Sequence, residues 1–426
     1  MDLKELERRM IETRRDLHRF PEPAWTEFRT SALVAARLEE LGYAPRAGRE
    51  VIDEDSVMGR PSEAEIDQEI ARAVEQGGER GWIERMGRYT GVTADLDTGR
   101  PGPTLAFRFD MDCVDVGEDT SPDHRPAKEG FASVNPCRMH ACGHDAHTAI
   151  GLGVAELLAE MKGRLCGRVR LIFQPGEEGC RGAYAMMKKG VVDDVDFFLA
   201  MHIGGGVPTG TFGLNSLGYL ATTKLDARFT GVPAHAAGAP HMGRNALLAA
   251  ATAALGLHSI APHRDGAMRL NVGVLQAGTG RNVVPAEALM KVETRGETQE
   301  VADYVYGRAE EVLKGAATMY GVRVELSKAG EGTTARGDEE LIRRVGAALR
   351  ASGLFRNVLD VVRAGGSEDA TWFMRRVQER GGEAVYMALG ADITAPHHNG
   401  RFDVDERGML PGARAMAAIA ESLLGQ

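Results

Sequence analysis

The feature that most restricts the fold of this chain is an alternation of short apolar runs with helical patterns. Four runs have the length and composition of buried strands, at residues 105–109, 169–173, 197–201 and 384–389. Segments with apolar residues at helical spacing separate these runs. The alternation predicts a doubly wound α/β fold with a mostly parallel sheet, whose ligands bind beyond the carboxyl ends of the strands.

A second order of elements lies in the middle of the chain. Residues 218–331 predict two helices and four strands: strand 225–229, helix 245–259, strands near Leu270 and Leu289, helix 301–319 and a strand near Val322. This β-α-β-β-α-β order is that of a ferredoxin-like domain. Because 426 residues exceed what one core usually serves, we expect a small domain at 218–331 inserted between two segments of a larger one, 1–217 and 332–426.

Composition limits the possible partners. A formal net charge of -10 argues against nucleic acid as the main partner, because phosphate contacts need clustered Lys and Arg. No apolar run has the length of a membrane span, and the charged start MDLKELERRM lacks the apolar core of a signal peptide. Five cysteines, an odd number, suit a reducing compartment. We therefore expect a cytoplasmic protein that binds a small molecule and neither nucleic acid nor membrane.

Residues able to bind metal follow the predicted strands. Asp110 and Asp112 end the first strand on one face, although such a pair also suits a solvated turn. The next polar segment, MHACGHDAH, contains Cys142 and His144, which are close enough in sequence to reach one metal ion or a close pair. The alternative interpretation is a buried cysteine with helix-capping histidines. Gly143 between them permits a tight turn.

Three further strand ends carry similar residues. Glu177 and Glu178 are adjacent, so their carboxylates point to different sides of an extended chain, and one can bind metal while the other acts as general base. His202 follows the third strand, where a lone histidine is usually a core residue. His397 and His398 follow the fourth. Five such ligands exceed the three of a single catalytic zinc, which predicts two divalent ions, manganese or zinc.

These motifs resemble the M20 metallopeptidase family in its amidohydrolase branch. The resemblance extends over nearly the whole chain and is carried by RRDLHRFPE, DMD, MHACGHDAHT, QPGEEG, AMHI, GVPAHAA and GGSEDA. It implies that two metal ions are bound by Cys142, His144, Glu178, His202 and His398. It also implies that Glu177 is the general base and that Asp112 supports the metal ligands. Metallopeptidases of this family generally have His-x-Asp where this chain has Asp110-Met111-Asp112. Of the two adjacent histidines near the end of the chain, alignment to Phe402 favours His398 over His397 as the ligand.

The resemblance also implies roles in the small domain, as a lid and a dimerisation domain. His235 of GVPAHAA would approach the scissile carbonyl from the lid and stabilise the oxyanion. Asn282 and Arg295 are candidates for binding the substrate carboxylate, although a surface salt bridge explains Arg295 equally well. Ser367 and Glu368 of GGSEDA would line the pocket, and a helix N-cap with an acidic first turn explains the same string.

The implied activity is cleavage of an N-acyl amino acid at its amide bond. The first substrate to test is p-aminobenzoyl-glutamate, which would yield p-aminobenzoate and glutamate. Indole-3-acetyl-aspartate or a hippurate-like amide would suit the same metal site. A noncatalytic member of a two-chain hydrolase is a further alternative, which the presence of Glu177 disfavours. The expected assembly is a homodimer through the lid, or a heterodimer with a related chain.

Overall fold

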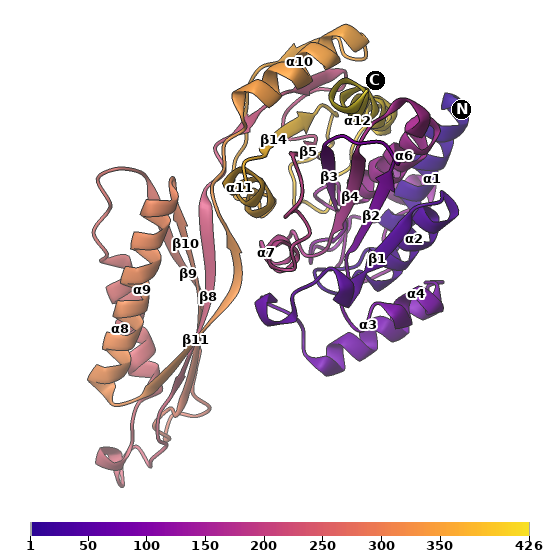
Figure 1. Cartoon of the computed structure of the whole chain (residues 1–426). Coiled ribbons are helices and arrows are strands. Elements are labelled where there is room, and N and C mark those ends of the chain that lie inside the picture. The colour runs from indigo at the N-terminus through magenta and orange to yellow at the C-terminus, as the bar shows by residue number, and fades with distance from the viewer. Residues whose placement is uncertain (1, 426) are drawn as a thin grey trace. The chain divides into compact units, whose positions relative to one another are not determined.

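The computed structural model describes residues 2–425, which divide into two compact units. The large unit contains the chain up to Leu217, Ala335–Ala364 and the chain from Asp369 onward. The small unit contains Gly218–Thr334 and Gly365–Glu368. Each unit has a core of its own (Figure 1).

The large unit is built on an eight-stranded sheet. Its strand order is β1 (Ala44–Ala47), β2 (Val92–Asp97), β4 (Arg168–Gln174), β3 (Thr104–Asp110), β5 (Phe197–Ile203), β14 (Glu383–Leu389), β6 (Thr211–Gly213) and β12 (Asn357–Leu359). The central strands β4, β3, β5 and β14 are parallel, with Phe109 opposite Phe173 and Met201 opposite Met387. Antiparallel pairs join β1 to β2, β2 to β4 and β6 to β14. The predicted mostly parallel α/β sheet is confirmed for this unit.

Helices cover the sheet because its central strands are apolar on both faces. α6 (His144–Met161) packs against α1 (Leu3–Arg19), α2 (Phe28–Glu40), α12 (Met409–Leu424) and β3 (Figure 1). α7 (Gly182–Lys188) and α11 (Thr371–Glu379) pack together and against β4 and β14. Gly151 lets α6 approach closely, since a Cβ there would lie 2.6 Å from the ring of Phe173. Burying such a phenylalanine contributes about 1.5–3 kcal/mol.

Helix α6 is buried on almost every side, as its apolar sequence requires. Its apolar character serves the core of the large unit, where Ile150, Val154 and Leu158 are fully buried. Among residues 2–425, no helix combines the length and the hydrophobicity needed to cross a bilayer.

An additional pair of helices follows β1. α3 (Glu63–Glu75) and α4 (Arg80–Arg85) both pack against α2. α3 begins with a capping box formed by two residues three apart in the sequence: the Ser62 hydroxyl accepts from the Glu65 N–H at 3.3 Å, and the Glu65 carboxylate accepts from the Ser62 N–H at 2.8 Å. Ile66 and Ala73 of α3 are buried, so this helix is a folded part of the large unit although many of its residues are acidic.

The small unit has one four-stranded antiparallel sheet. Its elements run in the order β8 (Ala221–Thr230), α8 (Ala246–His258), β9 (Met268–Ala277), β10 (Glu287–Gly296), α9 (Gln299–Tyr320) and β11 (Arg323–Gly332). The strand order is β11-β8-β10-β9. α8 and α9 pack on each other and on the sheet, burying Phe229, Met290 and Leu313 between them. Asn245 caps α8, because its side chain accepts from the Leu248 N–H.

Candidate metal centre

The site lies at the carboxyl ends of the central parallel strands, where ligands of such sheets bind. Asp110 ends β3, Gln174 ends β4 and precedes Glu177, and His202 lies at the end of β5. The loop after β14 carries His398, whose N–H donates to the carbonyl of Ala141 at 2.8 Å. That bond joins the C-terminal loop to the residue before Cys142.

Several overlapping groups of metal-ligating atoms meet here, and two of them share Cys142. One consists of Cys142, His144 and His202, and the other of Cys142, Glu178 and His398, with the ligand atoms of each group within 4.8 Å of one another. The Cys142 Sγ lies 3.4 Å from the His202 Nε2, and the His398 Nε2 lies 3.2 Å from a Glu178 carboxylate oxygen. Thiolate, imidazole and carboxylate suit zinc or manganese. The donor set therefore fits two divalent ions that share Cys142.

His144 gives the strongest sign that a metal belongs in this cluster. Its Nδ1 lies 2.9 Å from the carbonyl oxygen of Asp112, so the ring donates there and its Nε2 carries the lone pair. That Nε2 is buried and has no hydrogen-bond partner. Its neighbours are carboxylates of Asp110 at 3.7 Å and Glu177 at 3.9 Å. A buried nitrogen without a partner costs free energy, and a metal ion would satisfy it.

His147 is close to the ligands but is not available as one. Its Nδ1 lies 2.5 Å from a carboxylate oxygen of Asp110, and its Nε2 accepts from the Ile203 N–H at 2.8 Å. Its ring also packs edge-on against that of His202, with centroids 4.7 Å apart. The His202 Nδ1 donates in turn to the Ile203 carbonyl at 2.8 Å, which directs its Nε2 toward Cys142. His147 thus orients His202.

Asp112 holds the two adjacent glutamates. It is fully buried, and its carboxylate accepts from the N–H of Glu177 at 3.0 Å and from that of Glu178 at 2.8 Å. Its own backbone carbonyl accepts from His144. One aspartate therefore fixes three residues of the site, without contributing an oxygen to either of the two ligand groups around Cys142.

A second buried network lies beneath Asp110. Arg108 donates to Asp110 at 2.6 Å and to the Gln174 side chain at 2.7 Å. The Gln174 amide donates to Asp369 at 2.7 Å, and Asp369 also accepts from the N–H groups of Gly182 and Ala183 at the start of α7. No sequence pattern pointed to Arg108, which lies within an apolar strand. Asp369 could have been suspected from its place in GGSEDA.

The electrostatics of the cluster reflect an excess of anionic donors. Hydrogen bonds to Cys142 and Glu178 raise the pKa of His398 to about 10. Burial opposes a charge on His144, but Asp110 and Cys142 raise its pKa well above the usual value. Burial lowers the pKa of His202 well below its usual range. The neighbouring anionic side chains thus favour the charged forms of His144 and His398, whereas burial favours the neutral form of His202.

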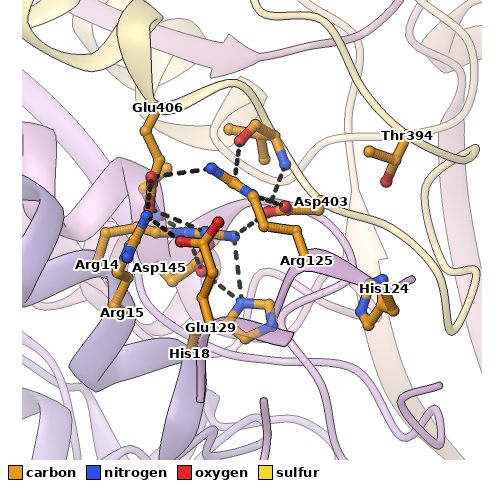
Figure 2. A network of polar contacts seen from close by, with 12 residues as sticks. Arg14, Arg15, His18, His124, Arg125, Glu129, Asp145, Thr394, Asp403 and Glu406 are labelled. Atoms are coloured by element: carbon orange, nitrogen blue, oxygen red, sulfur yellow. Dashed lines mark hydrogen bonds and ion pairs between the residues drawn. The ribbon is translucent and has the colours of Figure 1, made fainter. Parts of the chain in front are cut away.

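Behind the cluster, Arg14 joins helix α6 to the C-terminal loop (Figure 2). Arg14 is fully buried and lies 2.8 Å from Asp145, 2.8 Å from Asp403 and 3.3 Å from Glu406. Asp145 directly follows His144, so this network anchors the start of α6. The same arginine fixes the segment that follows His398.

His18 and two more arginines complete this network. The His18 ring lies 2.8 Å from Asp145 through Nδ1 and 2.9 Å from Glu118 through Nε2. Arg15 and Arg125 both pair with Glu406, at 2.8 Å and 2.9 Å. Both ring nitrogens of His18 have partners, so this histidine braces helix α1 and is not a metal ligand.

The residues predicted from the small unit occupy exposed strands and loops. The His235 Nδ1 accepts from the N–H groups of Ala237 and Gly238, at 3.2 Å and 3.0 Å. Asn282 is exposed beside it, and its carbonyl accepts from the Ala236 N–H. Arg295 lies 3.0 Å from Glu293 on the same strand, as in the salt-bridge interpretation.

Ser367 and Glu368 belong to the small unit rather than to the larger one, which was predicted to contain them. The Ser367 hydroxyl is buried without a hydrogen-bond partner. Helix α11 starts at Thr371 and has no side-chain cap, so the N-cap interpretation of this string is wrong. The acidic residue of GGSEDA that caps a helix is Asp369, and the helix is α7.

Comparison with known proteins identifies similar chains. The model of Peptidase family M20/M25/M40 matches residues 106–422. An indole-3-acetyl-aspartic acid hydrolase from Enterobacter agglomerans is 53% identical over 420 residues, 98% of this chain and 96% of the relative. One of the subunits of p-aminobenzoyl-glutamate hydrolase from Escherichia coli K12 is 51% identical over 409 residues, 96% and 94% of the two chains. The crystal structure of an aminobenzoyl-glutamate utilization protein from Klebsiella pneumoniae aligns with a TM-score of 0.85 and 46% identity, over 98% and 96%.

Proposed function

Because this chain belongs to peptidase family M20/M25/M40, we propose that it is a two-metal amidohydrolase that cleaves the amide bond of N-acyl amino acids. The observation that carries the proposal is the buried, unpartnered Nε2 of His144 among two overlapping groups of metal-ligating atoms. Glu177 lies beside this cluster, with a carboxylate oxygen 3.9 Å from that Nε2. Metal ligands with a neighbouring carboxylate are what hydrolysis by an activated water requires.

The five ligands proposed for two manganese or zinc ions share one cluster: Cys142, His144, Glu178, His202 and His398. When bound, such ions polarise an amide carbonyl and make a water molecule acidic at neutral pH. His202 and His144 both present Nε2 to this cluster because their Nδ1 atoms donate to backbone carbonyls. Asp112 accepts a hydrogen bond from the Glu178 N–H, and His147 accepts one from the N–H of Ile203, the residue after His202.

Glu177 is proposed as the general base. Its backbone is fixed by Asp112, and its carboxylate remains next to the ligand cluster. Glu177 would take a proton from the attacking water as the new C–O bond forms. It would then give this proton to the nitrogen as the C–N bond breaks, releasing the amino acid.

We propose that the small unit is a ferredoxin-like lid. The His235 Nδ1 accepts two backbone N–H groups, which places the ring proton on Nε2. An Nε2–H is the donor that an oxyanion needs. Asn282 and Arg295 are proposed to bind the substrate carboxylate, for which Arg295 must leave Glu293. Ser367 and Glu368 are proposed to line the pocket.

A homodimer through this lid is the proposed assembly. α8 exposes Leu248 and Leu255, which are 45% and 79% exposed, and exposed apolar side chains on one helix favour a protein partner. A heterodimer with a related chain is the second candidate, because the Escherichia coli relative is named as one of the subunits of its enzyme. The cytoplasmic location stays a prediction from the sequence.

We propose p-aminobenzoyl-glutamate as the first substrate, and indole-3-acetyl-aspartate as the second. Relatives named for these two amides are 51% and 53% identical to this chain, so identity does not rank them. Both amides end in an amino acid with a second carboxylate. A hippurate-like amide, which lacks one, is the third candidate.

The test is hydrolysis of the three amides by the purified chain with added manganese or zinc. We expect metal-dependent release of glutamate from p-aminobenzoyl-glutamate, and none from the Glu177→Ala variant. Turnover of indole-3-acetyl-aspartate or hippurate alone would retain the chemistry and refute the first substrate. No turnover of any amide by the metal-loaded chain would favour the noncatalytic member of a two-chain hydrolase.

A further inference from the structure

Arg181 follows the two glutamates of the candidate metal centre by three residues. Its guanidinium packs against the backbone of Gly179, since a Cβ at Gly179 would lie 2.7 Å from the Arg181 Nε and 3.2 Å from its Nη2. Gly179 also has a φ of 89°, which suits a residue without a side chain. The loop thus places a cation against the residue that follows Glu178.

This cation lacks an anionic partner among residues 2–425. The Arg181 Nε is buried without a hydrogen-bond acceptor, and Nη1 donates to the carbonyl of Gly59 at a long 3.3 Å. Other arginines near the site are paired with carboxylates: Arg108 with Asp110, and Arg14 with Asp145. Arg181 is partly exposed, so its guanidinium is accessible to the carboxylate of a ligand.

The segment before α3 holds Arg181 in place. The Gly59 carbonyl accepts from Arg181, and the neighbouring carbonyl of Met58 accepts from the buried indole of Trp25 at 2.8 Å. At the other end, the Asp53 N–H donates to the carbonyl of Ala185 in α7 at 3.1 Å. Residues 53–59 therefore contact Arg181 and helix α7, which follow Glu177, and this segment has a positioning role there.

We propose that Arg181 determines specificity by binding the side-chain carboxylate of an acidic leaving amino acid. The inference rests on the proposed function, which places the scissile amide at the ligand cluster. The side-chain carboxylate of glutamate or aspartate is a few bonds from that amide, so a cation against Gly179 is within its range. An arginine offers such a carboxylate two parallel N–H donors.

The test compares p-aminobenzoyl-glutamate with its neutral isostere p-aminobenzoyl-glutamine. We expect the native chain, loaded with manganese or zinc, to prefer the glutamate amide. Arg181→Met should lower kcat/KM for that amide by about 10- to 100-fold, the worth of a charge-assisted hydrogen bond, and leave the glutamine amide within about threefold. Arg181→Lys should retain part of the preference, because it keeps the charge.

A matched control is Arg343→Met, which removes an exposed arginine paired with Glu340 on α10 (Glu339–Ser352) and should change neither rate. An equal loss on both amides in Arg181→Met, or an unchanged preference, would overturn the specificity role while leaving the proposed function intact. Failure of the metal-loaded native chain to cleave these two amides, indole-3-acetyl-aspartate and hippurate would overturn the proposed function, and this inference with it. Inhibition of the native chain by glutamate but not by glutamine would support the carboxylate site directly.

Discussion

The donor cluster around Cys142 and the network around Arg14 are both buried, polar and rich in histidine and carboxylate, yet they are built on opposite principles. In the Arg14 network, arginines balance the carboxylates (Figure 2), and both ring nitrogens of His18 have partners. In the donor cluster, the His144 Nε2 has none, and anionic donors face one another. The two clusters contain similar residue types. What distinguishes the structural network from the ligand site is whether its polar groups find hydrogen-bond and ion-pair partners within the protein.

The largest effect is expected on kcat when Glu177, the carboxylate proposed to transfer protons, is replaced. Glu177→Gln should lower kcat by about 10²- to 10⁴-fold, because general acid–base catalysis contributes that much. The metal content should stay that of the native chain, since Glu177 is not one of the proposed ligands. Steady-state kinetics with elemental analysis of the same preparation gives both quantities, and a kcat within about tenfold of native would contradict the role.

Breaking the balanced network should affect stability strongly. Arg14→Met removes the buried cation that Asp145 and Asp403 share, which costs about 3–5 kcal/mol of unfolding free energy. Urea unfolding of the metal-free chain measures this loss without the contribution of bound ions. Arg343→Met, on the surface, should stay within about 0.5 kcal/mol of native. A loss equal to that of the control would show that the network is not a brace.

Metal ions should stabilise the folded chain through the donor cluster, and not through the Arg14 network. Adding manganese or zinc at about 100 times its Kd should stabilise the native chain by about 2.7 kcal/mol for each ion bound, because the ions bind only the folded state. Cys142→Ala removes the ligand shared by both groups and should abolish most of this gain. Thermal unfolding with and without a chelator measures this stabilisation. An equal gain in the native and variant chains would refute the role of Cys142 as a metal ligand.

The smallest effect concerns acid stability. Burial would raise the pKa of Asp403, but Arg14 and Arg125 hold it below its usual value. A carboxylate whose folded-state pKa is depressed stabilises the fold above its unfolded pKa of about 3.9, and this contribution is lost as pH falls through the folded value. Asp403→Asn should therefore narrow the difference in unfolding free energy between about pH 6 and about pH 3. Parallel pH profiles for the native chain and this variant would contradict the assignment.

Local pattern was enough to predict the central strands and several helix ends. The apolar runs that became β3, β4, β5 and β14 are long enough to be buried on both faces, and the capping box at Ser62 is a contact between neighbours in sequence. The short strands β1, β6 and β12 escaped prediction because each is four residues or shorter. Their pairing, rather than their composition, makes them strands.

The sequence by itself determined which residue types stand at the strand ends, including Cys142 and the two adjacent glutamates. Only the tertiary structure decided which histidines are held by partners, as His147 and His18 are, and which nitrogen is left for a metal ion. It also brought Asp369 into contact with Gln174 at the end of β4, and the Arg181 side chain against Gly179. The physical reason is that secondary structure follows from periodicity over a few residues, whereas hydrogen-bond satisfaction depends on groups that meet only after folding.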